Sequence, residues 1–182
     1  MGIRDSQRKK VYTAERSVIE TYGRNNLSIK ECQQFTNKIA TSSFAVRKFG
    51  STDIYVDFGR GGAMAYKNGH WYDDYNEVWR FGNRISLGVW ARQEMVVIHE
   101  VAHIYASNIA SPHGWEFCSI YLDLVRHFLG AKAHADLKAS FKAHRVKFVK
   151  PREKRILSAG EREAMAGRMM AMRAARMEKV AL

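Results

Sequence analysis

The sequence predicts an α+β fold, in which a small, mostly antiparallel sheet packs on one long helix, with helices before the sheet and a basic helical arm at the end. Residues 6–40 and 91–130 carry apolar side chains at the three- and four-residue spacing of helices. Between them, residues 44–88 form short apolar runs separated by glycine-containing turns, which is typical of strands. Strands and helices grouped in separate stretches favour the α+β class.

Two helices are expected at the start of the chain. Residues 6–22 present one apolar face, and Gly23 is a typical helix stop. A second helix is expected to begin after Ser28, because Ser28 and Glu31 have the spacing of a capping box.

Short strands are expected next, joined by turns. They are predicted at residues 44–49, 54–58, 63–66, 78–81 and 84–88. Residues 59–62 and 67–70 are predicted turns, and the first lacks the lysine and following helix of a phosphate-binding loop. The aromatic side chains of this region are expected to fill a core rather than to stack on bases. They are Trp71, Tyr72, Tyr75, Trp79 and Trp90.

The second half of the chain is predicted to be helical. Uninterrupted helical patterns cover residues 91–108, 114–129 and 131–144, and Pro151 separates them from a Met-, Ala- and Arg-rich helix at 158–180. We therefore expect two parts, a core at residues 1–130 and a basic helical extension at residues 131–182.

The central helix carries the most informative motif, His99-Glu100-Val101-Ala102-His103. Side chains four residues apart lie on one helix face, so both imidazoles can bind one zinc ion. Glu100 can lie beside that metal and accept a proton from a bound water. The motif predicts a metal site with hydrolytic chemistry.

A catalytic zinc ion usually has three protein ligands, and three downstream residues are candidates for the third: His113, Glu116 and Asp123. We expect it to be His113, because Ser111 resembles an N-cap and Pro112 a first helical residue, which places His113 in an opening turn. Glu116 is more typical of a first-turn carboxylate, and Asp123 of a partner for a ligand histidine or a solvated acid.

The spacing excludes one class of zinc peptidase. The extended metzincin pattern requires glycine and histidine at two positions where this chain has Ala106 and Ile109.

His-Glu-x-x-His followed by His-Gly-x-x-Phe resembles the SprT-like metallopeptidase family, which includes the Spartan-type proteases that digest DNA–protein crosslinks. The resemblance covers about residues 75–130 and implies a zincin-like fold, three zinc-binding histidines and Glu100 as general base. The residues that carry it are His99, Glu100, His103, His113, Gly114 and Phe117. The stretch from Arg4 to Arg8 and the length also resemble uncharacterised metallohydrolases from actinobacteria and their phages.

The cysteines depart from this family pattern. Many SprT-like proteins carry a Cys-rich zinc ribbon, but this chain has only Cys32 and Cys118, too few to build one. We expect buried, reduced thiols and a cytoplasmic protein, with no apolar run long enough to span a membrane.

Positive charge is concentrated late in the chain. Residues 130–182 contain fourteen Lys and Arg against five Asp and Glu, whereas residues 1–129 contain sixteen against thirteen. Such an arm can bind DNA by neutralising phosphates, and the alternatives are an acidic protein, a membrane surface or a solvated tail.

Four further histidines have no second ligand at metal spacing and are expected to be surface or core residues. They are His70, His127, His134 and His144. The function that these patterns favour is a zinc metallopeptidase acting on peptide or protein substrates, with DNA binding through residues 130–182. The alternative is a basic nucleic-acid-binding or phage-associated interaction protein whose zinc is structural or absent.

Overall fold

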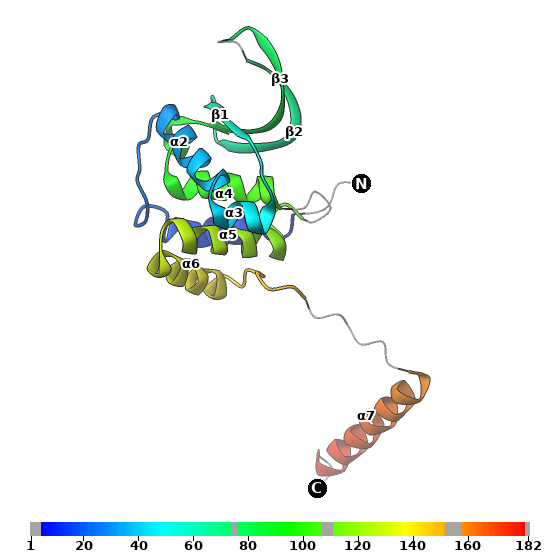
Figure 1. Ribbon diagram of the computed structural model, residues 1–182. Helices are drawn as coiled ribbons and strands as arrows, with labels where there is room; N and C mark the ends of the chain where they lie inside the picture. Colours follow the sequence, from blue (N-terminus) through cyan, green and yellow to red (C-terminus); the bar gives the residue numbers. More distant parts are fainter. Residues whose placement is uncertain (1–4, 74–75, 107–110, 152–157, 181–182) are drawn as a thin grey trace. The chain divides into compact units, whose positions relative to one another are not determined.

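The computed structural model describes residues 5–73, 76–106, 111–151 and 158–180, and it confirms the α+β class (Figure 1). The elements of the first unit of the chain, Met1–Lys150, are α1 (Arg8–Arg16), α2 (Ile29–Ala40), α3 (Ser43–Phe49), β1 (Ile54–Phe58), β2 (Ala63–Asp73), β3 (Val78–Leu87), the 3-10 turn η1 (Val89–Ala91), α4 (Glu94–Tyr105), α5 (Trp115–Phe128) and α6 (Ala131–Ala143). The second unit, Pro151–Leu182, contains α7 (Ala159–Val180).

The first unit extends past the boundary expected after residue 130. Helix α6 packs against α1 and α5 and buries Ala133, Leu137 and Phe141 completely. Residues 131–143 are therefore part of the core, and the separate part of the expected arm is the second unit.

The two N-terminal helices differ in how well they match the prediction. α1 ends at Arg16 rather than near residue 22, because the Val18 amide bonds to the Glu15 carbonyl in a tightened turn and the Ser17 hydroxyl bonds to the Ala14 carbonyl. α2 begins as predicted, since Ser28 and Glu31 form both hydrogen bonds of the capping box.

The strand expected at residues 44–49 is wrong, because this segment is the helix α3. The Ser42 hydroxyl caps its first turn by accepting a hydrogen bond from the Ala45 amide, and Gly50 ends it with a φ of 89°. A segment of seven residues is too short for its apolar pattern to distinguish a helix from a strand, so the N-terminal cap determines that it forms a helix.

The sheet is mixed rather than mostly antiparallel. Its strand order is β1-β3-β2, with β3 parallel to β1 and antiparallel to β2. Residues 84–87 of the strand predicted at 84–88 belong to the central strand β3, so they present no free edge to which a peptide could bind. The exposed edge nearest to α4 is β2.

Strands β2 and β3 are longer than predicted and form one hairpin. The turn expected at 67–70 is instead a bulge, where the register shifts between Tyr66 and Gly69 and Asn68 has a φ of 50°. The break expected before residue 84 is also absent, since β3 continues through Gly82. Glycine here marks irregular strand geometry and not chain reversal.

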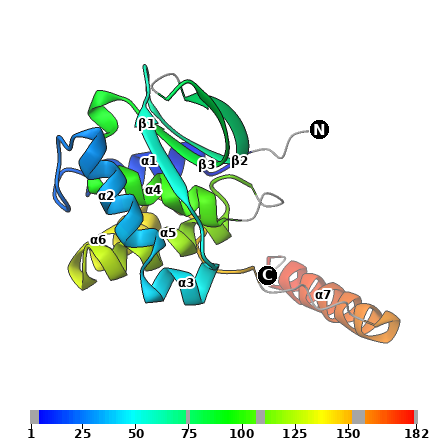
Figure 2. The ribbon, with the colours of Figure 1, turned by 45° about the horizontal axis from the view of Figure 1, so that its top comes forward.

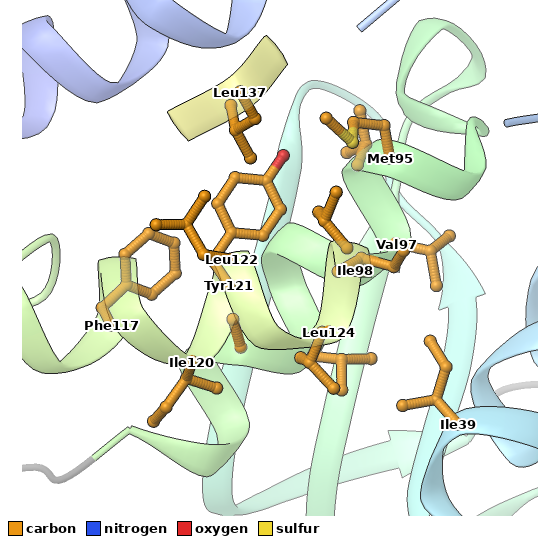
Figure 3. Close-up of a cluster of buried hydrophobic side chains, with 14 of the residues drawn as sticks. Ile39, Met95, Val97, Ile98, Phe117, Ile120, Tyr121, Leu122, Leu124 and Leu137 are labelled. Atoms are coloured by element: carbon orange, nitrogen blue, oxygen red, sulfur yellow. The ribbon is translucent and has the colours of Figure 1, made fainter. Parts of the chain in front are cut away.

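Helix α4 is the centre of the core. It packs on the sheet on one side and on α5 on the other (Figure 1), and Figure 3 shows side chains of α4 and α5 meeting around Tyr121 and Ile98. Almost all of α4 is buried, which explains why it is apolar on all sides. None of the described helices is long and apolar enough to span a bilayer.

The expectation that the aromatic residues fill the core holds for Trp71 alone. Tyr72, Trp79 and Trp90 are exposed, with Trp79 at 75% of its surface, and Tyr75 lies outside the described residues. The far halves of β2 and β3 extend beyond the described helices (Figure 1), which leaves Tyr72 and Trp79 exposed.

Candidate metal site

Three buried or half-buried histidines converge at one end of α4. His99 and His103 lie one turn apart on this helix, and His113 comes from the turn before α5. The Nε2 atom of His99 lies 3.2 Å from that of His103 and 3.4 Å from that of His113. One nitrogen from each ring lies within 4.8 Å of the others, so this cluster could hold a metal ion.

The structure decides between the three candidate third ligands. Among the described residues, Glu116 and Asp123 do not join the histidine cluster, and Asp123 forms an ion pair with Lys48. His113 is the candidate whose ring lies beside both helix histidines.

His113 is positioned by a turn and not by the helix itself. The N-cap of α5 is Gly114 rather than Ser111, and the Gly114 amide bonds to the Ser111 carbonyl at 2.7 Å. A Cβ atom on Gly114 would lie 2.9 Å from that carbonyl oxygen, so a side chain would open the turn. Residues 107–110, which connect α4 to this turn, lie outside the described residues.

Two carboxylates from the N-terminal segment orient the imidazoles. Oε1 of Glu15 lies 2.6 Å from Nδ1 of His99, and Oδ2 of Asp5 lies 2.6 Å from Nδ1 of His113. An Nδ1 proton donated to a carboxylate leaves the Nε2 lone pair free for a metal. This is the arrangement that histidine ligands usually have in metal sites.

Sequence reasoning missed both carboxylates, although one of them left a signal. Glu15 lies on the apolar face of α1, four residues after Val11 and three before Val18, and it is buried. An acidic residue at such a position needs a partner, because an unpaired buried charge is costly.

The electrostatics of the cluster suit a cation. Burial and the neighbouring imidazoles lower the pKa of His103 to about 2, and burial together with His99 lowers the pKa of His113. Burial opposes protonation of His99 as well, but Glu15 and Glu100 outweigh it and raise the pKa of His99. The imidazoles of His103 and His113 therefore favour the neutral form, which offers lone pairs to a divalent ion, and the neighbouring acidic groups can compensate the charge of that ion.

Glu100 lies between the histidines and two cavities. Its side chain is buried, with the residue 5% exposed, and burial raises the pKa of its carboxyl group. A cavity of about 620 Å³ is bordered by Glu100, His103, His113, Lys67 and residues 63–65 at the start of β2. A second cavity of about 350 Å³ shares Glu100 and adjoins His99. The acid and the imidazoles therefore face space that a substrate can enter.

Helix α1 closes this end of the site. The ring of Tyr12 stacks on His99, with centroids 5.6 Å apart, and meets His113 edge-on at 5.1 Å. In Figure 2, α1 lies beside α4 and behind β1. Gln7 holds the turn in place by donating to the His113 carbonyl at 2.9 Å.

No family model, curated protein or solved structure matches this chain. The functional argument therefore depends on the geometry of the site.

Proposed function

We propose that this chain is a zinc-dependent hydrolase that cleaves peptide bonds. The observation that supports it is the convergence of three imidazole Nε2 atoms beside a buried glutamate, at the wall of a cavity. This is the activity that the resemblance to SprT-like metallopeptidases implies.

The donor set favours zinc with a catalytic role. Imidazole suits zinc, and structural zinc sites are closed by four protein ligands, whereas catalytic sites use three. Among the described residues, three metal-binding side chains come together, and they adjoin a cavity. This argues against the alternative of a nucleic-acid-binding protein with a structural zinc.

His99, His103 and His113 would hold the metal. A zinc ion in such a site supplies Lewis acidity, which lowers the pKa of water and polarises a carbonyl group. The carboxylate of Glu100 accepts the proton from the attacking water and delivers it to the nitrogen of the leaving amine. Burial raises the pKa of this carboxyl group, which makes the carboxylate a stronger base toward the attacking water.

A peptide substrate is favoured by the position of β2. Residues 63–65 of this edge strand border the same cavity as Glu100 and His103, and the outer side of β2 has no partner strand in the described sheet. An extended peptide can bind there by backbone hydrogen bonds, which are independent of its side chains.

The test separates metal binding from hydrolysis. Glu100→Gln should retain one zinc per chain and lose cleavage of an unfolded protein such as casein, whereas His103→Ala should lose the zinc. Glu116→Gln is the matched control, because it removes a nearby carboxylate that lies outside the cluster. A wild-type protein without stoichiometric zinc, or a zinc-loaded Glu100→Gln protein with full activity, contradicts the proposal.

We propose DNA as a further partner of the second unit. The described side chains of α7 are almost all exposed, and they include the basic residues Arg162, Arg168, Arg173 and Arg176. In the full chain, replacing these four arginines with glutamine should weaken DNA binding and reduce its dependence on salt. Unchanged salt-dependent binding would show that DNA contacts another part of the protein.

A further inference from the structure

The face of α1 that covers the metal site carries two groups that neither hold the metal nor move the proton. Arg8 and Tyr12 are four residues apart and therefore lie on the same side of the helix. The guanidinium carbon of Arg8 lies 5.6 Å from the centroid of the Tyr12 ring. Arg8 and Tyr12 each line the two cavities that Glu100 also lines.

Tyr12 is held in place at its ring and accessible at its edge. The ring contacts His99 and His113, while 38% of the residue remains exposed. The hydroxyl group of tyrosine can donate a hydrogen bond. The contacts place this donor beside the imidazoles without making it a ligand.

Arg8 has no carboxylate partner among the described residues, although three acids lie close to it. Asp5 is paired with the ring of His113, and it also accepts a bond from the Arg8 backbone amide, while Glu15 is paired with His99. The guanidinium therefore keeps donors for a group outside the protein.

The other described cation that borders the cavity of about 620 Å³ is Lys67, and it already has a hydrogen-bond partner. The Nζ atom of Lys67 donates to the Ala106 carbonyl at 2.9 Å. Of the two cations among the described residues that border the cavity of about 620 Å³, Arg8 is thus the one whose side chain is not bonded to a described carbonyl or carboxylate oxygen, and it can bind an anion.

The proposed reaction creates such an anion. When the water oxygen bonds to the carbonyl carbon, the electron pair of the C=O bond moves to the oxygen, and Glu100 takes the proton of the water. Collapse restores the C=O bond, breaks the C–N bond and transfers the proton to the amine. Donors directed at the developing oxyanion commonly contribute more to the rate than any other single feature.

We propose that Arg8 and Tyr12 bind this oxyanion and act as catalytic residues, an inference that rests on the proposed hydrolase function. The pair stabilises the transition state more than the substrate, since the negative charge exists only after attack. Its loss should therefore lower kcat and leave KM nearly unchanged.

The experiment compares Tyr12→Phe and Arg8→Gln with Lys10→Gln, which removes a charge from an exposed position of α1 outside the cavities. Each test variant should lower kcat about 100-fold with KM within about threefold. Zinc content should not change. Arg8→Lys, which keeps the charge, should retain more activity than Arg8→Gln.

A second measurement does not use turnover. The affinity of the zinc-loaded proteins for a phosphonate peptide, which carries a tetrahedral anion in place of the scissile amide, should fall in parallel with kcat/KM. Unchanged kcat, or a raised KM at constant kcat, overturns the inference, and the second result would instead assign Arg8 to a substrate carboxylate. If the wild-type protein itself binds no zinc or cleaves no peptide, the proposed function fails as well.

Discussion

Replacing Glu15 with glutamine tests whether the N-terminal helix is part of the metal site. The Glu15 carboxylate contacts Nδ1 of His99 at 2.6 Å, and the two side chains are 7% and 4% exposed. Solvent therefore screens this pair far less than a surface ion pair. Glutamine keeps the size of the side chain and removes its charge, so the change reports on electrostatics.

The expected loss of zinc affinity follows from the role of carboxylates that orient histidine ligands. Removing a carboxylate that orients a histidine ligand typically weakens metal binding about 10- to 100-fold. This factor corresponds to about 1.4 to 2.7 kcal/mol. At saturating zinc, the contribution of metal binding to the free energy of unfolding falls by the same amount. For a chain of 182 residues, each kcal/mol changes Tm by about 2 to 4 °C, so the expected loss in Tm is roughly 3 to 11 °C.

The assay is the difference in Tm between zinc-loaded protein and protein in excess chelator, combined with zinc affinity from chelator competition. Taking this difference cancels any effect of the substitution on the metal-free fold. Glu20→Gln is the matched control, because it removes an exposed charge from the same segment. If Glu15→Gln shows the wild-type zinc affinity and the wild-type increment in Tm, Glu15 does not support the metal site.

The remaining predictions concern the fold. Ser28→Ala removes the cap of α2 and should lower the free energy of unfolding by about 0.5 to 2 kcal/mol, measured by urea denaturation; no change would mean that packing alone holds α2. Thr36→Val should preserve or raise stability, because the buried Thr36 hydroxyl has no hydrogen-bond partner among the described residues; a loss above about 1 kcal/mol would contradict this. Hydrogen bonds from Asn76 and Arg80 lower the pKa of Asp73 to about 2. The charged form therefore stabilises the folded state above the usual pKa of about 4, and this contribution is lost as the pH falls toward about 2. Asp73→Asn should therefore make the free energy of unfolding depend less on pH between about 4 and 2, as measured by tryptophan fluorescence. If the pH profile of the variant matches that of the wild type, the Asp73 carboxylate does not stabilise the fold.

Local signals predicted the helical parts of the fold well. The capping box at Ser28 and the apolar pattern of α5 depend on neighbouring residues, and the structure matches both. The same reasoning failed for residues 44–49 and for the turn at 67–70, where a cap and a bulge decided the outcome. Such features depend on a single hydrogen bond or one positive φ, which periodicity does not record.

The cluster of three histidines was predictable because its members are close in sequence. His99 and His103 are fixed by helix geometry, and His113 follows within a short connection, so spacing alone indicated that they could converge. Asp5 and Glu15 are 108 and 84 positions away from the histidines they contact. No local pattern joins such distant residues.

The sequence by itself therefore determined most of the helices and the spacing of the three imidazoles, because both follow from interactions within a few residues along the chain. Tertiary structure alone decided which strand forms the exposed edge, which carboxylates orient the ligands, and that α1 brings Arg8 and Tyr12 to the cavity wall. The physical reason is that burial of the apolar faces of α1 and α4 brings distant segments together, and their polar groups then meet as a consequence.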